Sequence, residues 1–258
     1  MKLSDYYTID CCSLSTEFMP AQSIHAFAEK VALITDGDSP IGRAVALQLA
    51  LQGCYVTVGF SQISESNQSA LAELQNLGTL AAAIEADVST IEGAKRLVGA
   101  VENMFGRLDL LVNCLKFRAD SSFEQVTEDV FAKTFDVNTK AAFFVTQEAI
   151  RLMKPRPKPK IVNVASAVDT PESEQNVLFA ASQNALIGLT KSLAAALPQK
   201  FRVNAVAVSE KQASRENELD AELFRPKTGV SEDDAARTIV YLLSSEAIAL
   251  NGQILKIQ

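Results

Sequence analysis

The fold class of this chain is decided by the stretch Lys30-Val-Ala-Leu-Ile-Thr-Asp-Gly-Asp-Ser-Pro-Ile-Gly42. Residues 31–35 form an apolar run with the length of a buried strand, and residues 40–52 carry apolar positions at helical spacing up to Gly53. A short turn with one glycine, Gly37, separates the two segments, and a second glycine, Gly42, lies in the first turn of the helix. In α/β folds, such a turn lets the helix N-terminus present its N–H groups to an anionic ligand. The stretch therefore predicts the first strand–turn–helix unit of an α/β domain.

Short apolar runs and amphipathic segments continue to alternate along the rest of the chain. Further strands are expected at 54–60, 80–86, 108–113, 160–165, 202–208 and 253–257, and further helices at 66–77, 89–105, 128–153, 177–197 and 233–244. Strands that alternate with helices form parallel sheets through right-handed crossovers. We expect a single doubly wound, Rossmann-type α/β domain over residues 30–258, with a mainly parallel seven-stranded sheet and helices on both faces. Residues 1–29 are an N-terminal extension.

Composition limits the classes of function. The 258 residues include 24 Lys+Arg and 31 Asp+Glu, so the formal net charge is −7. Nucleic acids and anionic membranes attract clustered positive charge, and neither is expected as a partner. The one basic segment, Lys154-Pro-Arg-Pro-Lys-Pro-Lys160, is explained more simply as a solvated, proline-stiffened connector than as a binding motif. No stretch has the length and apolar character of a membrane span.

Residues suited to metal binding and proton transfer are scarce. Cys11, Cys12, Cys54 and Cys114 lack metal-ligand spacing, so we expect reduced structural thiols, no metal and a cytoplasmic protein. The start of the chain lacks the apolar run of a signal peptide. There is one histidine, His25, and only four tyrosines. A mechanism that needs a histidine or tyrosine acid therefore has few available residues.

Several short motifs fix a resemblance to a known family. They are Thr35 to Gly42, Asp87-Val88, Phe105-Gly-Arg-Leu-Asp109, Asp136-Val-Asn138, Ile161-Val-Asn-Val-Ala-Ser166 and Arg202-Val-Asn-Ala-Val206. From about Lys30 onward, the chain resembles the short-chain dehydrogenase/reductase family. The family turn, Thr-Gly-x-x-x-Gly-x-Gly, matches Thr35 to Gly42 in length and frame. Its first glycine is Asp36 here, and its second is Pro40.

The resemblance implies a catalytic set that is only partly present. Ser166 matches the serine that orients the substrate carbonyl, and Asn138 matches the asparagine that holds a relay water. Alternatively, Asn138 only holds the helix distortion that family members show at this point. The family Tyr-x-x-x-Lys pair falls on Phe179 and Gln183. A phenyl ring has no proton to give, and positioned acid catalysis contributes about 10²–10⁴-fold in rate.

The resemblance also implies an NADP or NAD site. Its positions are Thr35, Gly37, Ile41, Gly42, Ser61, Asp87, Val88 and Asn113. The carboxylates of Asp36 and Asp38 would repel a pyrophosphate. The stretch 59–62 offers neither a carboxylate for a ribose 2′-hydroxyl nor an arginine for a 2′-phosphate. We hypothesise that Lys116 lies across this site and pairs with Asp36 or Asp38; the alternative is that Lys116 is a surface residue at a strand end.

Two hypotheses on function follow. In the first, the protein has lost NAD(P)-dependent hydride transfer and serves as a scaffold, a regulatory subunit or a ligand sensor. In the second, it is an atypical NADP(H)-dependent oxidoreductase of the pteridine-reductase-like branch, acting on a small carbonyl or pterin-like substrate through Ser166 and Asn138. Fold kinship alone does not decide between them.

The resemblance further implies assembly through the helices around 128–153 and 177–197. A homodimer or homotetramer is expected, and a hetero-oligomer with an active relative is an additional hypothesis. Apolar and small residues form continuous faces on these helices, which either an interface or a core stripe explains: Ala141, Ala142, Val145, Ala149 and Leu152, then Ala185, Leu189, Leu193 and Leu197.

Overall fold

The computed structural model describes residues 26–62, 65–119, 121–167, 177–209 and 230–257. Seven parallel strands form one sheet in the order β3-β2-β1-β4-β5-β6-β7. The strands are β1 (Val31–Ile34), β2 (Tyr55–Phe60), β3 (Ala81–Glu85), β4 (Leu110–Asn113), β5 (Lys160–Ser166), β6 (Arg202–Val208) and β7 (Ile254–Ile257). The doubly wound α/β fold is confirmed, and the sheet is parallel throughout rather than mainly parallel.

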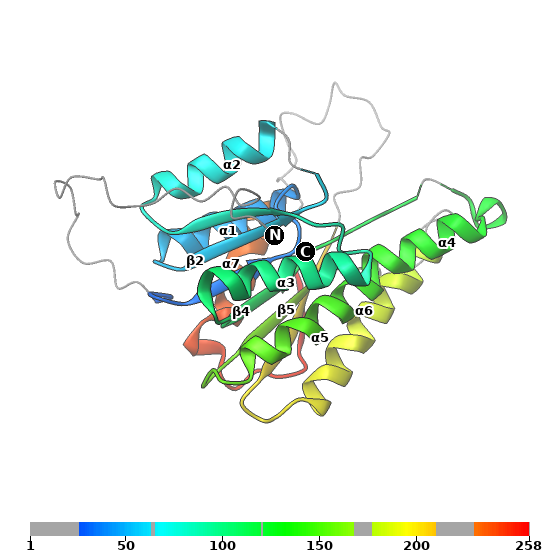
Figure 1. Cartoon of the computed structure of the whole chain (residues 1–258). Helices are drawn as coiled ribbons and strands as arrows, with labels where there is room; N and C mark the ends of the chain where they lie inside the picture. Colours follow the sequence, from blue (N-terminus) through cyan, green and yellow to red (C-terminus); the bar gives the residue numbers. More distant parts are fainter. Residues whose placement is uncertain (1–25, 63–64, 120, 168–176, 210–229, 258) are drawn as a thin grey trace, which may run out of the picture.

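Helices cover both faces of the sheet (Figure 1). The α-helices are α1 (Pro40–Leu51), α2 (Glu65–Asn76), α3 (Ile91–Phe105), α4 (Glu128–Phe135), α5 (Ala141–Met153), α6 (Val177–Ala196) and α7 (Glu232–Leu243). Apolar residues of α1, α2 and α7 pack on one face, and those of α3, α5 and α6 pack on the other. Burial on both faces explains why the strands are apolar along their whole length.

The helix expected over residues 128–153 contains a distortion. Between α4 and α5 the backbone forms one π-helical turn, Asp136–Lys140, so the three segments run on as one long element. Asn138 lies in this turn and is fully buried. Turns of this kind are rare and often occur at functional sites. The position of the distortion agrees with the structural role considered for Asn138.

The apolar face expected on α5 for assembly belongs largely to the protein's own core. Ala141, Val145, Ala149 and Leu152 are buried in the cluster beneath α3 and α5. A core stripe therefore accounts for this set, and it is not available to another subunit. The large apolar side chains that stay exposed on the long element are Phe131 and Phe143.

Packing of the domain begins before Lys30, where the sequence placed its start. Phe27 lies within the expected extension, yet it is buried in the core, and its N–H donates to the carbonyl of Gln52 at 3.2 Å.

In the part of the chain that the structure describes, no helix is both long and apolar enough to cross a membrane.

Candidate functional site

A cavity of about 270 Å³ lies where β1, β4, β5 and β6 end. We call it the carboxyl-edge cavity. In open α/β sheets, ligands bind at this edge near the point where the strand order reverses, which here lies between β1 and β4. Its lining residues come from the turn after β1, the ends of β4, β5 and β6 and the start of α7: Ser39, Pro40, Ile41, Cys114, Lys116, Val164, Ala165, Ser166, Val208, Ser209, Val230, Ser231 and Glu232.

The turn after β1 forms one wall of this cavity, and its backbone donors are largely occupied. The Asp36 carboxylate Oδ1 accepts the N–H of Asp38 at 3.2 Å and that of Ser39 at 3.3 Å. The N–H of Gly37 donates to the carbonyl of Gly59 at 3.0 Å. Pro40, at the first position of α1, has no N–H. A carboxylate of the chain itself thus holds N–H groups of the turn.

The first turn of α1 is capped by a side chain. Ser39 Oγ accepts the N–H of Gly42 at 3.0 Å and donates to the carbonyl of Asp36 at 3.1 Å. Gly42 is required here, because a Cβ at this residue would lie 1.9 Å from the Asp36 carbonyl oxygen. The predicted residue Gly42 therefore lies in the turn, with its N–H on the Ser39 hydroxyl.

Lys116 is exposed and also lines the carboxyl-edge cavity. Burial raises the pKa of the Asp36 carboxyl above its ordinary value, while hydrogen bonds from Asp38 and Ser39 and the positive charge of Lys116 act in the opposite direction. The charge of Lys116 is the smallest of these contributions, and its pairing with Asp36 or Asp38 stays a hypothesis. Glu232 brings a carboxylate to the same cavity from the start of α7.

Cys114 forms part of the same wall. Its thiol is buried and contacts the carbonyl of Asp36 at 3.4 Å, and burial raises its pKa to about 12. Cys54 is likewise a free buried thiol, and Cys11 and Cys12 lie outside the described residues. That the cysteines are reduced structural thiols stays a prediction. Among the described residues, no group of three His, Cys, Asp or Glu side chains is placed to hold a metal ion.

Ser166 ends β5 and lines the cavity, as predicted. Its N–H donates to Gln183 Oε1 at 2.8 Å. This bond fixes the amide, and the buried Gln183 Nε2 points away from Ser166 N. It has no hydrogen-bond partner among the residues that the structure describes. The side chain at the family lysine position is therefore fixed to the end of β5 by a neutral hydrogen bond.

Phe179, at the family tyrosine position, is packed away in the protein. Its side chain is buried, and the guanidinium carbon of Arg118 lies 5.3 Å from the ring centroid. The ring borders a small cavity on the α4 side with Val126, Val130 and others, and it does not line the carboxyl-edge cavity. Phe179 and Ser166 thus line different cavities.

Asn138 uses its side chain to hold two neighbouring segments. Its Oδ1 accepts the N–H of Phe117 at 2.6 Å, and its Nδ2 donates to the Phe117 carbonyl and to Ser182 Oγ, both at 2.8 Å. These bonds tie the π turn to α6 and to the segment after β4. The structural role considered for Asn138 fits this geometry.

The other predicted cofactor residues fall into three settings. Thr35 is buried, and its Oγ1 accepts the N–H of Cys114 at 3.1 Å. Asn113 is buried, and its Nδ2 donates to Asn163 at 2.9 Å and to Thr146 at 3.2 Å. Ile41 lines the cavity, and Ser61 is exposed. Only Ile41 and Ser166, among the predicted site residues, line the carboxyl-edge cavity.

Asp87 and Val88 follow β3. The Asp87 carboxylate accepts the N–H of Ser89 at 3.1 Å and its hydroxyl at 2.6 Å, while Val88 is buried.

Gly37 lies against Phe60, whose ring atoms would be 2.5–2.6 Å from an added Cβ. Phe60 ends β2, where a ribose-binding carboxylate would stand, and it is buried.

Sequence reasoning missed the contact between Phe60 and Gly37 and the contribution of α7. A bulky apolar residue at the end of the strand expected over 54–60 was the available signal for Phe60. For α7, the signal was Ser231-Glu-Asp-Asp234, a capping sequence whose hydroxyl accepts the N–H of Asp234. Ser231 and Glu232 reach the cavity because the helix begins there.

Comparisons with known proteins agree with this architecture. The family model described as "short chain dehydrogenase" matches residues 30–222. The 3-oxoacyl-[acyl-carrier-protein] reductase of Staphylococcus aureus strain N315 is 31% identical over 232 residues, which cover 87% of this chain and 94% of the relative. The chain belongs to the short-chain dehydrogenase/reductase family.

Two solved structures show the same likeness in three dimensions. A short chain dehydrogenase from Burkholderia cenocepacia J2315, in complex with NADP, superposes with a TM-score of 0.81 at 29% identity, covering 90% of this chain and 98% of its own. The acetoin dehydrogenase YohF from Salmonella typhimurium superposes with a TM-score of 0.78 at 30% identity, covering 89% and 94%. The fold is therefore that of NAD(P)-dependent oxidoreductases.

Proposed function

We propose that this family member has lost NAD(P)-dependent hydride transfer and acts through its retained fold as a scaffold, regulatory subunit or ligand sensor. The observation that carries the proposal is the turn after β1. Its Asp38 and Ser39 N–H groups are held by the Asp36 carboxylate, and its Gly42 N–H is held by Ser39 Oγ. These donors do not fit a pyrophosphate unless the turn rearranges, and the same carboxylate repels it.

The catalytic positions support the same proposal. Phe179 is buried under Arg118, and a phenyl ring neither donates nor accepts a proton. Gln183 is neutral and is committed to the N–H of Ser166. Even with a cofactor bound, the family acid step would lack its acid and the cation that activates it, a loss of about 10²–10⁴-fold.

A calorimetric titration of the full chain with NADPH and with NADH tests the proposal. We expect no binding in the micromolar range. The double variant Asp36→Gly/Pro40→Gly frees the turn donors, and it should gain affinity for NADPH. Asp38→Asn is the matched control, because it removes one nearby charge without freeing the N–H groups that Asp36 accepts.

The outcomes of this titration are distinct. Micromolar binding by the unchanged protein would overturn the proposal. An equal gain in the Asp38→Asn control would show that charge alone, rather than occupied donors, weakens binding. Circular dichroism of each variant shows whether the fold is intact. An unchanged affinity for NADPH is therefore not mistaken for the result of unfolding.

A second candidate is an atypical NADP(H)-dependent oxidoreductase for a small carbonyl or pterin-like substrate. The observation that favours it is the retained carboxyl-edge cavity with the Ser166 hydroxyl in its wall. A relative of this fold is described in complex with NADP, and another is named an acetoin dehydrogenase. Part of the resemblance to the pteridine-reductase-like branch falls on residues 210–229, outside the described residues. Oxidation of NADPH by acetoin or a dihydropterin in the presence of the protein would support this candidate.

Assembly is part of the proposal. A homodimer or homotetramer, or a hetero-oligomer with an active relative, would use the long element formed by α4 and α5 together with α6. Phe131 and Phe143 are 51% and 43% exposed, and both lie on this element. Exposed aromatic side chains favour burial against a partner. Sedimentation of the titration samples measures the mass, and a monomer would remove support for this part.

A further inference from the structure

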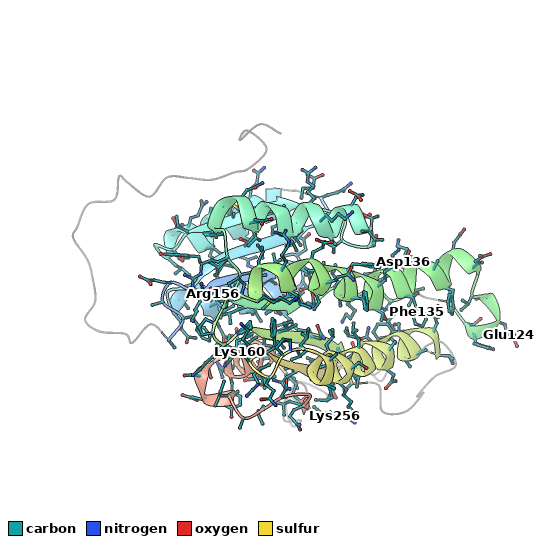
Figure 2. The ribbon with its side chains drawn as sticks, turned by 60° about the horizontal axis from the view of Figure 1, so that its bottom comes forward. Glu124, Phe135, Asp136, Arg156, Lys160 and Lys256 are labelled. Carbon is teal, nitrogen blue, oxygen red and sulfur yellow. The ribbon has the colours of Figure 1, made fainter. Side chains whose placement is uncertain are left out.

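The edge of the sheet opposite the carboxyl-edge cavity gathers positive charge. The parallel strands β1, β5 and β6 all start there, and register pairs Lys160 directly with Arg202. Lys30 and Lys158 add their charges, since both lower the pKa of Lys160 by repulsion. With the exposed Lys154 and Lys200, we call this set of six cations the basic edge. Figure 2 shows Arg156 and Lys160 at this end of the molecule, away from Phe135 and Asp136.

The contacts of the basic edge are mostly with main-chain carbonyls. Lys160 Nζ donates to the carbonyl of Ser244, which caps the C-terminus of α7. Lys200 Nζ donates to the carbonyl of Lys154, and Arg202 donates to the carbonyls of Ile248 and Gln199. A carbonyl satisfies a donor without neutralising its charge. The carbonyls of Ser244 and Lys154 lie at helix C-termini, each equivalent to about half a negative charge, so these hydrogen bonds offset only part of the positive charge.

Few carboxylates offset this charge. Asp109 is buried close by, and it is already shared by Arg107 and Arg156. Glu29 is exposed next to Lys30 in the sequence, and the exposed Glu246 lies between Ser244 and Ile248, whose carbonyls accept from Lys160 and Arg202. Burial lowers the pKa of Lys160 to about 8, and repulsion from Lys158, Arg202 and Lys30 adds to this effect as the smaller cause. A bound anion would relieve that repulsion.

The loop that carries three of these lysines is held in place. Its three prolines restrict the backbone, the N–H of Lys154 donates to the carbonyl of Ile150 at 2.8 Å, and the N–H of Arg202 donates to that of Pro159 at 3.0 Å. A preorganised set of charges loses less entropy on binding than a flexible one. The loop therefore has features of a recognition surface in addition to those of a connector.

We propose that the basic edge binds a short acidic segment of a partner protein. The cations are spread along a loop and three strand starts, so they match a row of carboxylates better than one compact anion. The net charge of the whole chain is −7, and this surrounding field opposes long polyanions such as nucleic acid. A short segment that contacts only this edge avoids most of that repulsion.

A fluorescein-labelled octaglutamate peptide, titrated with the full chain at low and physiological salt, tests the proposal by anisotropy. The variant Lys154→Gln/Lys158→Gln/Lys200→Gln removes three exposed charges, and it should weaken binding about tenfold or more at low salt. The matched control is Lys95→Gln/Lys191→Gln/Lys256→Gln, which changes the net charge equally at exposed sites elsewhere. It should bind within about twofold of the unchanged protein, because distant charges are screened.

Three results would overturn the proposal. They are no binding of octaglutamate to the unchanged protein, an equal loss in both triple variants, and tighter binding of a single-stranded oligonucleotide of matched charge and label. Thermal melting of both variants is the folding control, since Lys154, Lys158 and Lys200 are exposed and their loss should leave the melting temperature nearly unchanged.

Discussion

The turns that open α1 and α3 share one local structure although they lie at different positions in the fold. The first reads Asp36-x-x-Ser39-x-x-Gly42, and the second reads Asp87-x-x-Thr90-x-x-Gly93. In each, the Ser or Thr hydroxyl accepts the glycine N–H at 3.0 Å and donates to the carbonyl of the aspartate, at 3.1 Å for Ser39 and 2.8 Å for Thr90. Both helices therefore begin with the same side-chain cap.

The two aspartates also act alike. Asp36 accepts the N–H of Asp38, and Asp87 accepts that of Ser89, in each case two residues on. A family member uses the turn after β1 for the cofactor, whereas here that turn has the closed hydrogen bonding of an ordinary helix start. Under the proposed function, the comparison implies that a change of local motif occupies a phosphate site while leaving the fold unaltered.

The largest expected effect is at the two glycines. Gly42→Ala and Gly93→Ala place a Cβ 1.9 Å and 1.8 Å from a backbone carbonyl oxygen, and each should lower the free energy of unfolding by about 3 kcal/mol. Urea denaturation measures both. Gly99→Ala is the control, because nothing lies within 4 Å of its added Cβ and helix propensity should stabilise α3 by about 0.5–1 kcal/mol. If Gly42→Ala lowers the free energy of unfolding much less than Gly93→Ala does, the two turns do not share the same local structure.

A smaller effect is expected at the caps. Ser39→Ala and Thr90→Ala each remove the acceptor of one glycine N–H, and each should lower the free energy of unfolding by about 1 kcal/mol. Ser39→Thr keeps the hydroxyl, so it should retain most of the stability. Urea denaturation again gives the values. If Ser39→Ala costs nothing, water satisfies the N–H of Gly42 as well as the hydroxyl does, and the first turn is open to a ligand.

The sequence predicted the layered fold because strand and helix periods are local signals. It also placed Ser166 and Asn138 correctly at the end of β5 and in the long helical element. Periodicity could not distinguish a core stripe from an assembly face on α5, since both are apolar at the same spacing. Only the packing of the neighbouring helix α3 decides that question.

The details of the site depended on contacts between distant residues. The bond between Gln183 and Ser166 N joins two elements, and the contact of Phe60 with Gly37 depends on how β1 and β2 lie together. The resemblance implied that Phe179 and Gln183 replace a tyrosine and a lysine, but not which partners the replacements take. The hydrogen bonds of Asp36 form within a single turn, and the capping pattern it shares with Asp87 was a local signal that could have found them.

The smallest expected effect separates the two aspartates by burial. Burial raises the pKa of the Asp36 carboxyl, so the folded protein binds this proton at a higher pH than the unfolded chain does. Its contribution to stability therefore falls as the pH rises from the ordinary carboxyl value through the raised one, and it stays lower at neutral pH. Asp36→Asn keeps an acceptor without the charge, and it should raise the free energy of unfolding at neutral pH by less than either cap contributes.

The same substitution at Asp87 sharpens this prediction. Asp87 is exposed and accepts both the N–H and the hydroxyl of Ser89, so Asp87→Asn weakens these bonds without relieving burial. We expect no gain at neutral pH there. Urea denaturation of both variants, in acid and at neutral pH, measures the change in the free energy of unfolding. For Asp36→Asn the gain should vanish below the ordinary carboxyl pKa, because Asp36 is then protonated in both the folded and the unfolded protein. The opposite result would be a fall in the free energy of unfolding for Asp36→Asn that equals the fall for Asp87→Asn. It would mean that the hydrogen bonds of the Asp36 carboxylate contribute more than its burial costs. Asp36 would then hold the N–H groups of the turn more strongly than its raised pKa implies.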